Sequence, residues 1–490
     1  MSESYQRDYD RSDAGSIFRF SRHLMNRTLA EAVLAIDPSI SISEIDSAGK
    51  GAMGVLVEKF FYGYAPNSSP LPDFELAGLE LKTTPLKKLR NDELVLKERL
   101  VMDMIDFCSI VDVEFEESPF YRKSLLTLIL FYLHVAGNRK RDLTFLYSVL
   151  WQIKDKDLAI IRQDYELIVN KIRQGKAHEL SEGDTMYLGA CTKGHKDSPL
   201  RKQPFNTAGA KPRAFALKKA YMRTVLEFVR ASGDCLATNS EEYSKLPELV
   251  STDELKHKSF EQILSERFAP FIGLDYKQIG MHFGKVINAG MKNRYAYAAK
   301  MILNSRLKDF NDAEEIRKSG IIAKTIRISS TGTIKESMSF ENIDYSEILS
   351  NSEWTESRWY EIVTSRFMFV IYRQVQSDSP DWQGEERYVL DRLMFWTMPQ
   401  SDIDNAEDFW ANIRQNVVRD RLTDDTNDFW KLSDHRDFHV RPKAMTKEHT
   451  CTSPVSGKAV PRKAYWFNGA YITELLKNAY GNEWQEKFGN

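Results

Sequence analysis

Two short stretches of the chain, residues 125–132 and 367–372, are almost entirely apolar. Continuous apolar runs of this length are typical of strands that are buried on both faces, as in the middle of a sheet covered by helices. At 490 residues the chain is long enough for two domains, each with a core of its own. We therefore expect two domains, with a buried central strand in each.

A strict alternation of apolar and charged positions precedes the first apolar run. Leu79 and Leu81 alternate with Glu80 and Lys82, directly after an Ala-Gly pair that predicts a turn. Because successive side chains of a strand point to opposite faces, the leucines should face a core, and Glu80 and Lys82 should share the other face. The turn can bring Asp73 beside Glu80.

Two carboxylates that converge can hold a hard divalent cation through their oxygens. A lysine beside them can orient a water molecule or stabilise charge on a phosphate, so Asp73, Glu80 and Lys82 suggest a magnesium-dependent nuclease. The simpler alternative is a solvated sheet face, on which an acid and a base often alternate.

Two more charged residues lie close to this pattern in sequence. Glu58 falls among the apolar residues of a predicted amphipathic helix near residues 55–61, and Lys123 stands at the entrance to the first apolar run. Glu58 is either an exposed helix acid or a third carboxylate directed at the cation. Lys123 is either a surface lysine or a second cation that faces the phosphate.

Composition narrows the class of protein. Apolar residues make up 42% and charged residues 28% of the chain, which is typical of a globular protein. The N-terminus is polar and no run approaches the length of a membrane span, so we expect a soluble, cytoplasmic protein. The cysteines are scattered without a paired spacing, which argues against a zinc site and a disulfide framework: Cys108, Cys191, Cys235 and Cys451.

Basic residues are concentrated rather than abundant. The net charge is only −2, from 68 basic and 70 acidic residues, yet residues 189–223 contain nine Lys or Arg and one acid. The first part of this segment is rich in Gly, Pro, Asn and Ser and predicts a long loop. It is either a solvated basic loop or a clamp whose cations contact DNA phosphates and bases.

Several short elements occur in one order between residues 20 and 225: Lys50-Gly, Glu58, Asp73-Phe, Gly78-Leu-Glu80-Leu-Lys82-Thr, Lys123 and Arg213-Ala-Phe-Ala-Leu-Lys218-Lys219. This ordered set resembles the MutH family, which includes a mismatch-repair nickase and type II restriction endonucleases that cut at GATC. The resemblance implies an α/β fold with a mixed sheet flanked by helices, repeated in each domain, and Mg²⁺-dependent hydrolysis of DNA. Asp73 and Glu80 would be the metal ligands and Lys82 the catalytic lysine. Glu58 and Lys123 would support them in the active site.

The same resemblance implies that the basic segment reads double-stranded DNA in the major groove. Lys193 is the best candidate for a base contact, although its neighbours depart from the nickase's Arg-Pro-Lys. The other implied DNA-binding residues are Lys50, Arg213, Ala216, Lys218 and Lys219. Ala216 stands where the nickase has a tyrosine that helps to detect adenine methylation, so we expect N6-methylated GATC to be cut. Alternatively Ala216 only fills space and Lys50 senses the methyl group.

The second half of the chain repeats the pattern of the first without its acids. One constant offset pairs Lys50 with Lys292, Glu58 with Lys300, Asp73 with Glu315, Glu80 with Ile322 and Lys82 with Lys324. One acid, Glu315, remains and is expected to face a lysine excess. Arg441 and Lys443 lie in an Arg-Pro-Lys run, at the position that corresponds to the DNA-reading basic segment of the first half. We therefore expect a second domain that binds DNA without cutting it, or one that is purely structural.

These observations predict an N-terminal catalytic domain over residues 1–232, a linker over 233–257 and a C-terminal DNA-binding domain over 258–490. The expected activity is that of a type II restriction endonuclease at GATC, with the second domain as an allosteric site. We expect a monomer in solution, with dimerisation on DNA left open. A mismatch-repair nickase and a non-cleaving GATC-binding regulator are the alternatives.

Overall fold

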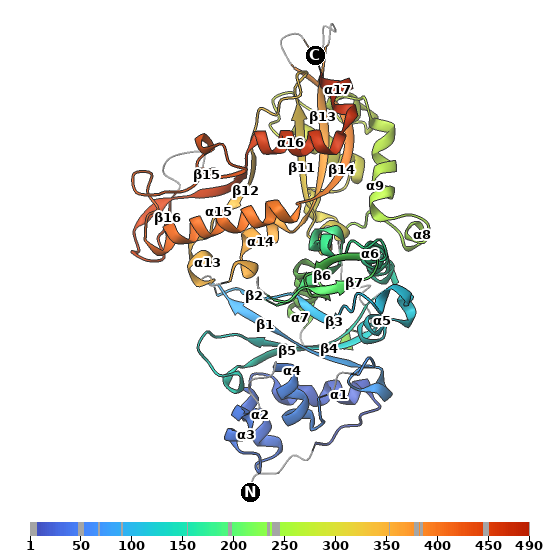
Figure 1. Ribbon diagram of the computed structural model, residues 1–490, viewed down its shortest axis with the longest axis vertical. Coiled ribbons are helices and arrows are strands. Elements are labelled where there is room, and N and C mark those ends of the chain that lie inside the picture. The colour runs from blue at the N-terminus through green and yellow to red at the C-terminus, as the bar shows by residue number, and fades with distance from the viewer. Residues whose placement is uncertain are drawn as a thin grey trace. The chain divides into compact units, whose positions relative to one another are not determined.

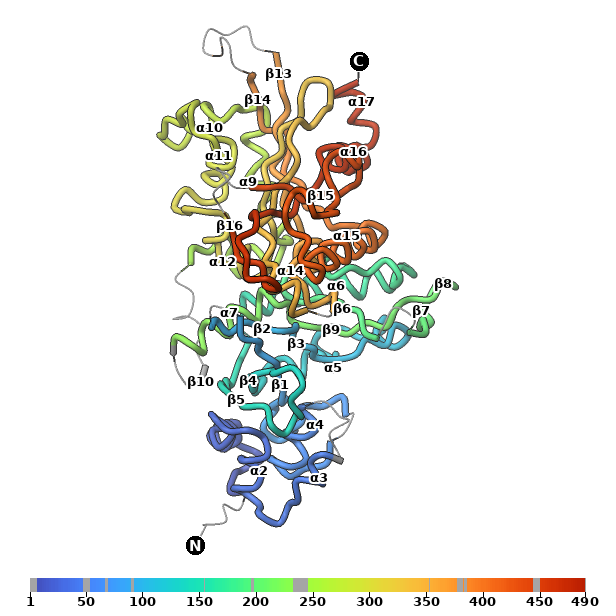
Figure 2. The backbone as a smooth tube through the Cα atoms, turned by 90° about the vertical axis from the view of Figure 1, so that its left-hand side faces the viewer, coloured from blue at the N-terminus to red at the C-terminus, as the bar shows by residue number. Residues whose placement is uncertain are grey.

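The computed structural model describes residues 7–47, 53–66, 69–89, 92–153, 155–194, 198–232, 236–237, 246–351, 353–376, 382, 386–443 and 450–489. The chain forms two compact units (Figures 1 and 2). Unit 1 comprises residues 1–246, 251–257 and 317–320, and unit 2 comprises residues 247–250, 258–316 and 321–490. The predicted domain limits of 1–232 and 258–490 stay a prediction.

Unit 1 is built around a five-stranded mixed sheet with the strand order β10-β5-β4-β1-β2. Its strands are β1 (Glu80–Lys88), β2 (Leu94–Leu96), β4 (Leu126–Leu133), β5 (Phe145–Gln152) and β10 (Leu236–Ala237). β1 runs parallel to β4, and β5 runs antiparallel to it. The first apolar run is thus the middle strand of the sheet, as its composition predicts.

A second, antiparallel sheet and a hairpin complete the strands of unit 1. The sheet has the order β3-β9-β6, and the hairpin joins β7 to β8. Their bounds are β3 (Leu100–Met104), β6 (Leu188–Thr192), β7 (Arg201–Gln203), β8 (Asn206–Ala210) and β9 (Arg213–Leu217). The basic segment was predicted to begin as a long loop. That prediction missed the hairpin, in which Gln203 and Asn206 hold the strands to residues 175–178.

Helices cover both sheets of unit 1. They are α1 (Ala14–Ser21), α2 (Leu29–Ile36), α3 (Ile42–Ser47), α4 (Met53–Leu56), α5 (Pro119–Ser124), α6 (Asp155–Arg173), α7 (Lys219–Ser232) and α8 (Thr252–Leu255). The predicted helix near residues 55–61 is α4, and it continues as a π-helical segment, Val57–Tyr62. This change of helix type is rare and frequently marks functional sites.

Unit 2 repeats this strand arrangement. Its first sheet has the order β11-β13-β14 and its second the order β12-β18-β15, beside a β16-β17 pair. The strands are β11 (Ile322–Ile328), β12 (Met338–Asn342), β13 (Arg366–Val375), β14 (Arg387–Thr397), β15 (Phe438–Pro442), β16 (Thr450–Thr452), β17 (Ala459–Pro461) and β18 (Lys463–Phe467). β11 is parallel to β13, and β14 is antiparallel to it, just as β1, β4 and β5 are related in unit 1.

The register of the two parallel strand pairs supports the internal repeat. Glu80 lies opposite Thr127 at the start of β1, and Ile322 lies opposite Phe367 at the start of β11. The short helix before each central strand is capped by a serine, Ser118 in α5 and Ser357 in α14 (Arg358–Val363). The two halves of the chain therefore share one topology, and Lys324 takes the strand position of Lys82.

The helices of unit 2 are α9 (Phe260–Phe268), α10 (Tyr276–His282), α11 (Arg294–Leu303), α13 (Tyr345–Ser350), α14, α15 (Gln400–Val418), α16 (Gly469–Tyr480) and α17 (Asn482–Phe488), with α12 (Glu314–Ser319) at its border with unit 1. α15 is 19 residues long, the same length as α6. No helix in the described residues is long and apolar enough to span a membrane.

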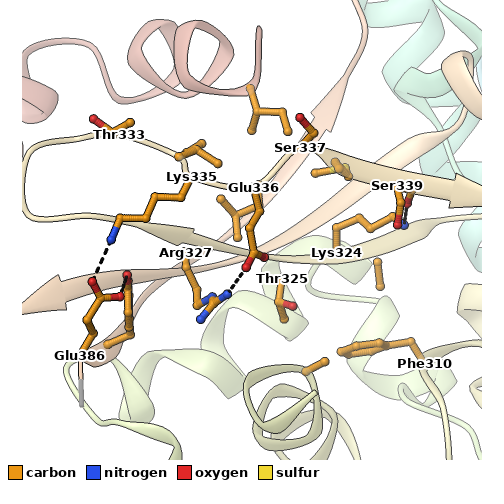
Figure 3. A pocket seen from close by; sticks show the side chains of 17 residues that line it. Phe310, Lys324, Thr325, Arg327, Thr333, Lys335, Glu336, Ser337, Ser339 and Glu386 are labelled. Atoms are coloured by element: carbon orange, nitrogen blue, oxygen red, sulfur yellow. Dashed lines mark hydrogen bonds and ion pairs between the residues drawn. The ribbon is translucent and has the colours of Figure 1, made fainter. Parts of the chain in front are cut away.

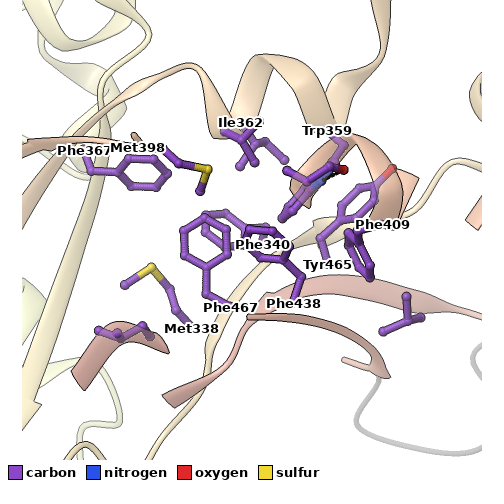
Figure 4. Close-up of a cluster of buried hydrophobic side chains, with 14 of the residues drawn as sticks. Met338, Phe340, Trp359, Ile362, Phe367, Met398, Phe409, Phe438, Tyr465 and Phe467 are labelled. Carbon is purple, nitrogen blue, oxygen red and sulfur yellow. Dashed lines mark hydrogen bonds between the residues drawn. The ribbon is translucent and has the colours of Figure 1, made fainter. Parts of the chain in front are cut away.

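Aromatic side chains dominate the core of unit 2 (Figure 4). Trp359 is fully buried, stacks on Tyr465 with ring centroids 4.8 Å apart, and donates from Nε1 to the carbonyl of Ala406. Phe340 and Phe467 pack against it from β12 and β18. The tryptophans Trp354, Trp359 and Trp410 are core residues, and large buried aromatic surfaces dominate core energetics.

Candidate active site

A tight turn brings Asp73 to the start of β1. Phe74 and Leu79 exchange two backbone hydrogen bonds of 2.9 and 3.1 Å across it. A single 3₁₀ turn at Glu75–Ala77 lies between them, and Gly78 closes it in the left-handed conformation with φ of 61°. That conformation strongly favours glycine. Leu79 and Leu81 are buried in the core, as predicted from the alternation.

Backbone N–H groups hold the carboxylates of both Asp73 and Glu80. The Leu81 N–H donates to Oδ2 of Asp73 at 2.9 Å, and the Asp73 N–H donates to Oε2 of Glu80 at 3.3 Å. These two bonds join the start of β1 to the residue before the turn and keep the two carboxylates close to it. The predicted convergence of Asp73 and Glu80 is therefore present in the structure.

Glu80 is deeply buried and is paired with Lys82. Its side chain is 3% exposed, and Nζ of Lys82 lies 2.6 Å from Oε1. Burial raises the pKa of Glu80 and the charge of Asp73 adds to this, while Lys82 and, more weakly, Lys123 lower it. The two residues thus share one face of β1, as the alternation predicted, and the lysine compensates part of a buried negative charge.

Glu58 contributes a third carboxylate from the π-helical segment. Burial, together with the charges of Asp73 and Glu80, raises the pKa of Glu58 to about 7 against the opposing effect of Lys82. Carboxylates that raise one another's pKa in this way lie within electrostatic reach of each other. Glu58 is therefore part of the same cluster rather than an isolated helix acid.

Lys123 reaches this region from α5, just before the central strand. Its side chain is largely buried, and Nζ lies 3.7 Å from Oδ1 of Asp103 on β3. Its charge also lowers the pKa of Glu80. The structure thus brings Lys123 within electrostatic reach of the carboxylates. Asp103 had no signal in the sequence, because it becomes a neighbour of Lys123 only through the packing of α5 on β3.

Tyr64 is a second residue at this cluster that sequence reasoning missed. Its ring packs edge-on against Phe74 with centroids 5.2 Å apart, and its hydroxyl is buried without a hydrogen-bond partner among the described residues. Burial raises the pKa of Tyr64, and Asp73, Glu58 and Glu80 raise it further in that order. The phenol therefore stays protonated beside three acids, as a hydrogen-bond donor.

The donor set suits a hard divalent cation. Carboxylate oxygens are the ligands that Mg²⁺ prefers, and the mutual repulsion of Asp73, Glu58 and Glu80 is what a cation would relieve. No three metal-ligating side chains in the described part of the chain are already gathered into a preformed site. In this conformation the ammonium of Lys82 lies beside the carboxylate of Glu80.

The predicted DNA-binding residues of unit 1 fall into two groups. Lys193 follows β6, with its N–H bonded to the carbonyl of Pro212, and Lys219 begins α7. Lys218 donates to the carbonyl of Thr185. Lys193, Lys218 and Lys219 are all partly exposed. Lys50 lies outside the described residues.

Arg213 and Ala216 are buried. Arg213 donates to the carbonyls of Ala190, at 3.0 Å, and Leu180, at 2.5 Å. Ala216 is fully covered and packs with Cys191 and Ala214. In the free chain Arg213 ties β9 to its neighbours, so its role in DNA binding stays a prediction. The same holds for Ala216.

Unit 2 lacks the carboxylates of the site. Ile322 occupies the strand position of Glu80, and Lys300, almost buried, donates to the carbonyl of Lys308 at 3.4 Å. Glu315 was expected to face a lysine excess, and this stays a prediction. Glu315 is fully buried and accepts hydrogen bonds from the backbone N–H groups of Leu249, at 2.9 Å, and Val250, at 3.3 Å.

The predicted reading residues of unit 2 lie at the end of β15. Arg441 is exposed and its guanidinium lies over the ring of Trp466, 4.1 Å from the centroid. Lys443 donates to the carbonyl of Phe340 at 2.7 Å. The two cations are thus held at one end of the sheet by an aromatic ring and a backbone carbonyl.

Known proteins are similar to the region of the chain that carries this site. The sequence model of the family described as DNA mismatch repair enzyme MutH matches residues 62–164, which include Asp73, Glu80, Lys82 and Lys123. Two proteins named DNA mismatch repair protein MutH are similar to part of the chain. The protein from Shewanella woodyi is 27% identical over 183 residues, 36% of this chain and 76% of its own length. The protein from Shewanella sp. strain MR-7 is 26% identical over 216 residues, 40% of this chain and 88% of its own length.

A third relative extends over both units. The type II restriction enzyme Sau3AI from Staphylococcus aureus is 32% identical over 487 residues, covering 94% of this chain and 93% of that enzyme. The MutH relatives match less than half of the chain, whereas this match includes the second unit with its altered site. The chain therefore belongs to the family of MutH-related type II restriction enzymes.

Proposed function

We propose that this protein is a restriction endonuclease that hydrolyses both strands of double-stranded DNA at GATC with Mg²⁺. One observation carries the proposal: backbone N–H groups of Leu81 and Asp73 hold the carboxylates of Asp73 and Glu80 at one turn, with Lys82 on the same strand face as Glu80. The chain-long similarity to Sau3AI supports the reaction class. The GATC preference rests on the family resemblance.

Asp73 and Glu80 would hold the divalent cation, which when bound would polarise the scissile phosphate and stabilise the leaving oxygen. Lys82 now neutralises Glu80 and would turn its ammonium to the attacking water or to the phosphate. Lys123 adds a second positive charge to the same region. Glu58, with a pKa near 7, can accept or hold a proton close to neutral pH.

Two other functions fit parts of the structure. A mismatch-repair nickase would need only a unit like unit 1, and the MutH relatives match 36% and 40% of the chain. A non-cleaving GATC-binding regulator would not need the Asp73, Glu80 and Lys82 cluster. Cleavage of a supercoiled plasmid separates the three functions: a linear product indicates restriction, nicked circles a nickase, and unchanged plasmid a binding protein.

Replacement of either predicted metal ligand should abolish cleavage. Asp73→Ala or Glu80→Ala should reduce the rate of plasmid cleavage by about 10³-fold or more, since a catalytic metal contributes several kcal/mol to the transition state. Lys82→Ala should be similarly impaired at saturating Mg²⁺. Glu75→Ala is the matched control, because Glu75 lies exposed on the same turn. Cleavage by Asp73→Ala at the rate of the unaltered enzyme would show that the site has been wrongly assigned.

The charge of Glu58 should make the metal-free protein less stable at alkaline pH. A folded-state pKa near 7, above the usual 4.5, means that the folded chain retains a proton that the unfolded chain releases. Stability from this group is complete below pH 4.5 and is lost as pH rises through 7. In EDTA, Glu58→Gln should therefore raise the melting temperature at pH 8 by about 2–4 °C, for about 1 kcal/mol in a unit of this size.

The same substitution should have little effect at pH 5, where Glu58 of the folded protein is protonated. The control is Glu166→Gln, which removes an exposed acid on α6. Thermal unfolding followed by circular dichroism at pH 5 and pH 8 measures the melting temperatures of both variants. Equal melting temperatures of Glu58→Gln and the parent protein at pH 8 would mean that the acid cluster is not repulsive.

Unit 2 is proposed to bind a second DNA site and to stimulate cleavage by unit 1. Arg441 and Lys443 stand at the predicted reading position of a unit whose metal ligands are replaced. A plasmid with two GATC sites should then be cut about fivefold faster than a plasmid with one site, a typical allosteric factor. Arg441→Ala should remove the difference, and Arg421→Ala, which removes an exposed arginine paired with Asp428, should keep it. Equal rates on both plasmids in the parent enzyme would rule out stimulation.

Adenine methylation should not protect the DNA. Ala216 replaces the family's tyrosine and offers neither a ring nor a hydroxyl to the adenine N6 group in the major groove. Fully N6-methylated and unmodified versions of one duplex should be cut at rates within about twofold of each other. Strong protection by the methyl group would show that another residue, such as Lys50, detects it.

A further inference from the structure

A pocket in unit 2 lies beside Lys324, the residue that matches Lys82 of unit 1. It has a volume of about 460 Å³ and is lined by β11, the segment leading into β12, and the start of β14 (Figure 3). Lys324 on β11 forms part of its wall, in the strand position that Lys82 occupies on β1. The pocket therefore contains the counterpart of the candidate catalytic lysine.

The charged groups of this pocket differ from those of unit 1. Arg327 pairs with Glu336 and Lys335 pairs with Glu386, at 2.7 and 2.8 Å, so these four charges compensate one another in pairs (Figure 3). Lys324 instead donates to the carbonyl of Ser339 at 2.6 Å, and its ammonium lies 4.7 Å from the ring centroid of Phe340. Nζ of Lys82 lies 2.6 Å from a carboxylate oxygen of Glu80, whereas Nζ of Lys324 is bonded to a neutral carbonyl oxygen.

A second ammonium approaches the same strand. Lys443 donates to the carbonyl of Phe340, the residue after Ser339 on β12. Burial and, next, the charge of Lys443 lower the pKa of Lys324 to about 8, against a smaller opposing effect of Glu341. The ammonium of Lys324 in the pocket wall thus lies within electrostatic reach of a second cation, and the two charges are incompletely compensated. Such a site favours an anion.

The groups that would recruit a metal ion have been replaced. Ile322 stands in place of Glu80, Lys300 takes the place of Glu58 in the internal repeat, and Glu315 accepts hydrogen bonds from two backbone N–H groups. In unit 1 a negative cluster needs a cation between itself and a phosphate. In unit 2 the ammonium of Lys324 supplies the positive charge itself.

We propose that this pocket binds one backbone phosphate of DNA directly on the ammonium of Lys324, without a metal ion. The hydroxyl-bearing residues of the lining, among them Thr325, Ser337 and Ser339, can complete the shell around the phosphate oxygens. The inference rests on the proposal that unit 2 binds a second DNA site. It adds that this binding uses the pocket around Lys324 and does not depend on Mg²⁺.

The test counts DNA molecules on the full-length protein in EDTA by native mass spectrometry, with a short GATC duplex as the probe. The unaltered protein should bind two equivalents. Lys324→Gln should weaken the second equivalent by roughly tenfold at 0.1 M salt and reduce its salt slope by about 0.9, because one phosphate contact is lost. Lys324→Arg should retain the second equivalent. Lys477→Gln, which removes an exposed lysine paired with Glu474, is the charge-matched control and should change affinity by less than twofold.

A second readout does not depend on substitutions. Acetic anhydride modifies accessible neutral amines, so the acetylation rate of Lys324 reports whether its ammonium is covered. In EDTA, a saturating GATC duplex should slow acetylation of Lys324 by about tenfold and leave Lys477 unaffected. Peptide mass spectrometry measures both lysines in one sample.

The outcomes separate this inference from the proposed function. A second equivalent that requires Mg²⁺, or that binds Lys324→Gln as tightly as the unaltered protein, would overturn the metal-free phosphate pocket but leave unit 2 as a DNA-binding unit. Unchanged acetylation of Lys324 in a two-to-one complex would overturn it as well. No second equivalent in either EDTA or Mg²⁺ would overturn both.

Discussion

The repulsion between carboxylates held at the start of β1 is the constraint on which the candidate active site depends. Asp73 and Glu80 are kept together by backbone N–H groups on either side of the Gly78 turn, not by any attraction between them. Burying such a pair is unfavourable unless positive charge is near. Lys82 supplies part of it, and the raised pKa values of Glu58 and Glu80 show that compensation is incomplete. The remaining field is what would draw in a divalent cation.

The two units show how one topology can carry opposite electrostatics. Both place a short serine-capped helix before a buried central strand, and both place a lysine at the third position of the strand parallel to it. In unit 1 that lysine is paired with a buried acid. In unit 2 it is bonded to a carbonyl beside a second lysine. The backbone geometry was kept, while the sign of the charge in the pocket was reversed.

Local patterns predicted the elements that carry the site. The alternation of Leu79 to Lys82 placed two leucines in the core and two charges on the other face, because a strand has a period of two. The apolar run before Leu133 predicted the central strand, and the matching run in the second half predicted its counterpart. The repetition of this run in the second half also predicted a second unit, and the family resemblance implied the mixed sheets.

Contacts between distant segments were not accessible from the sequence. Tyr64 reaches the acid cluster, and Asp103 reaches Lys123, only after α4, α5 and β3 have packed. Glu315 had the right offset to match Asp73, yet it is buried on the backbone of Leu249 and Val250, which no local pattern reveals. Arg213 lies in a basic segment, but its guanidinium is held by two carbonyls inside the fold. Charge counts along the chain do not distinguish a free cation from one used within the fold.

Metal binding by the free protein tests the central claim most directly. Isothermal titration with Mn²⁺, whose coordination preferences resemble those of Mg²⁺, should detect binding to the unaltered chain. That binding should be lost in Asp73→Asn and in Glu80→Gln, which remove charge with little change in shape. Glu315→Gln should leave it intact, because the acid of unit 2 is engaged by backbone N–H groups. Unchanged Mn²⁺ binding after loss of Asp73 and Glu80 charges, or its loss in Glu315→Gln, would contradict the account.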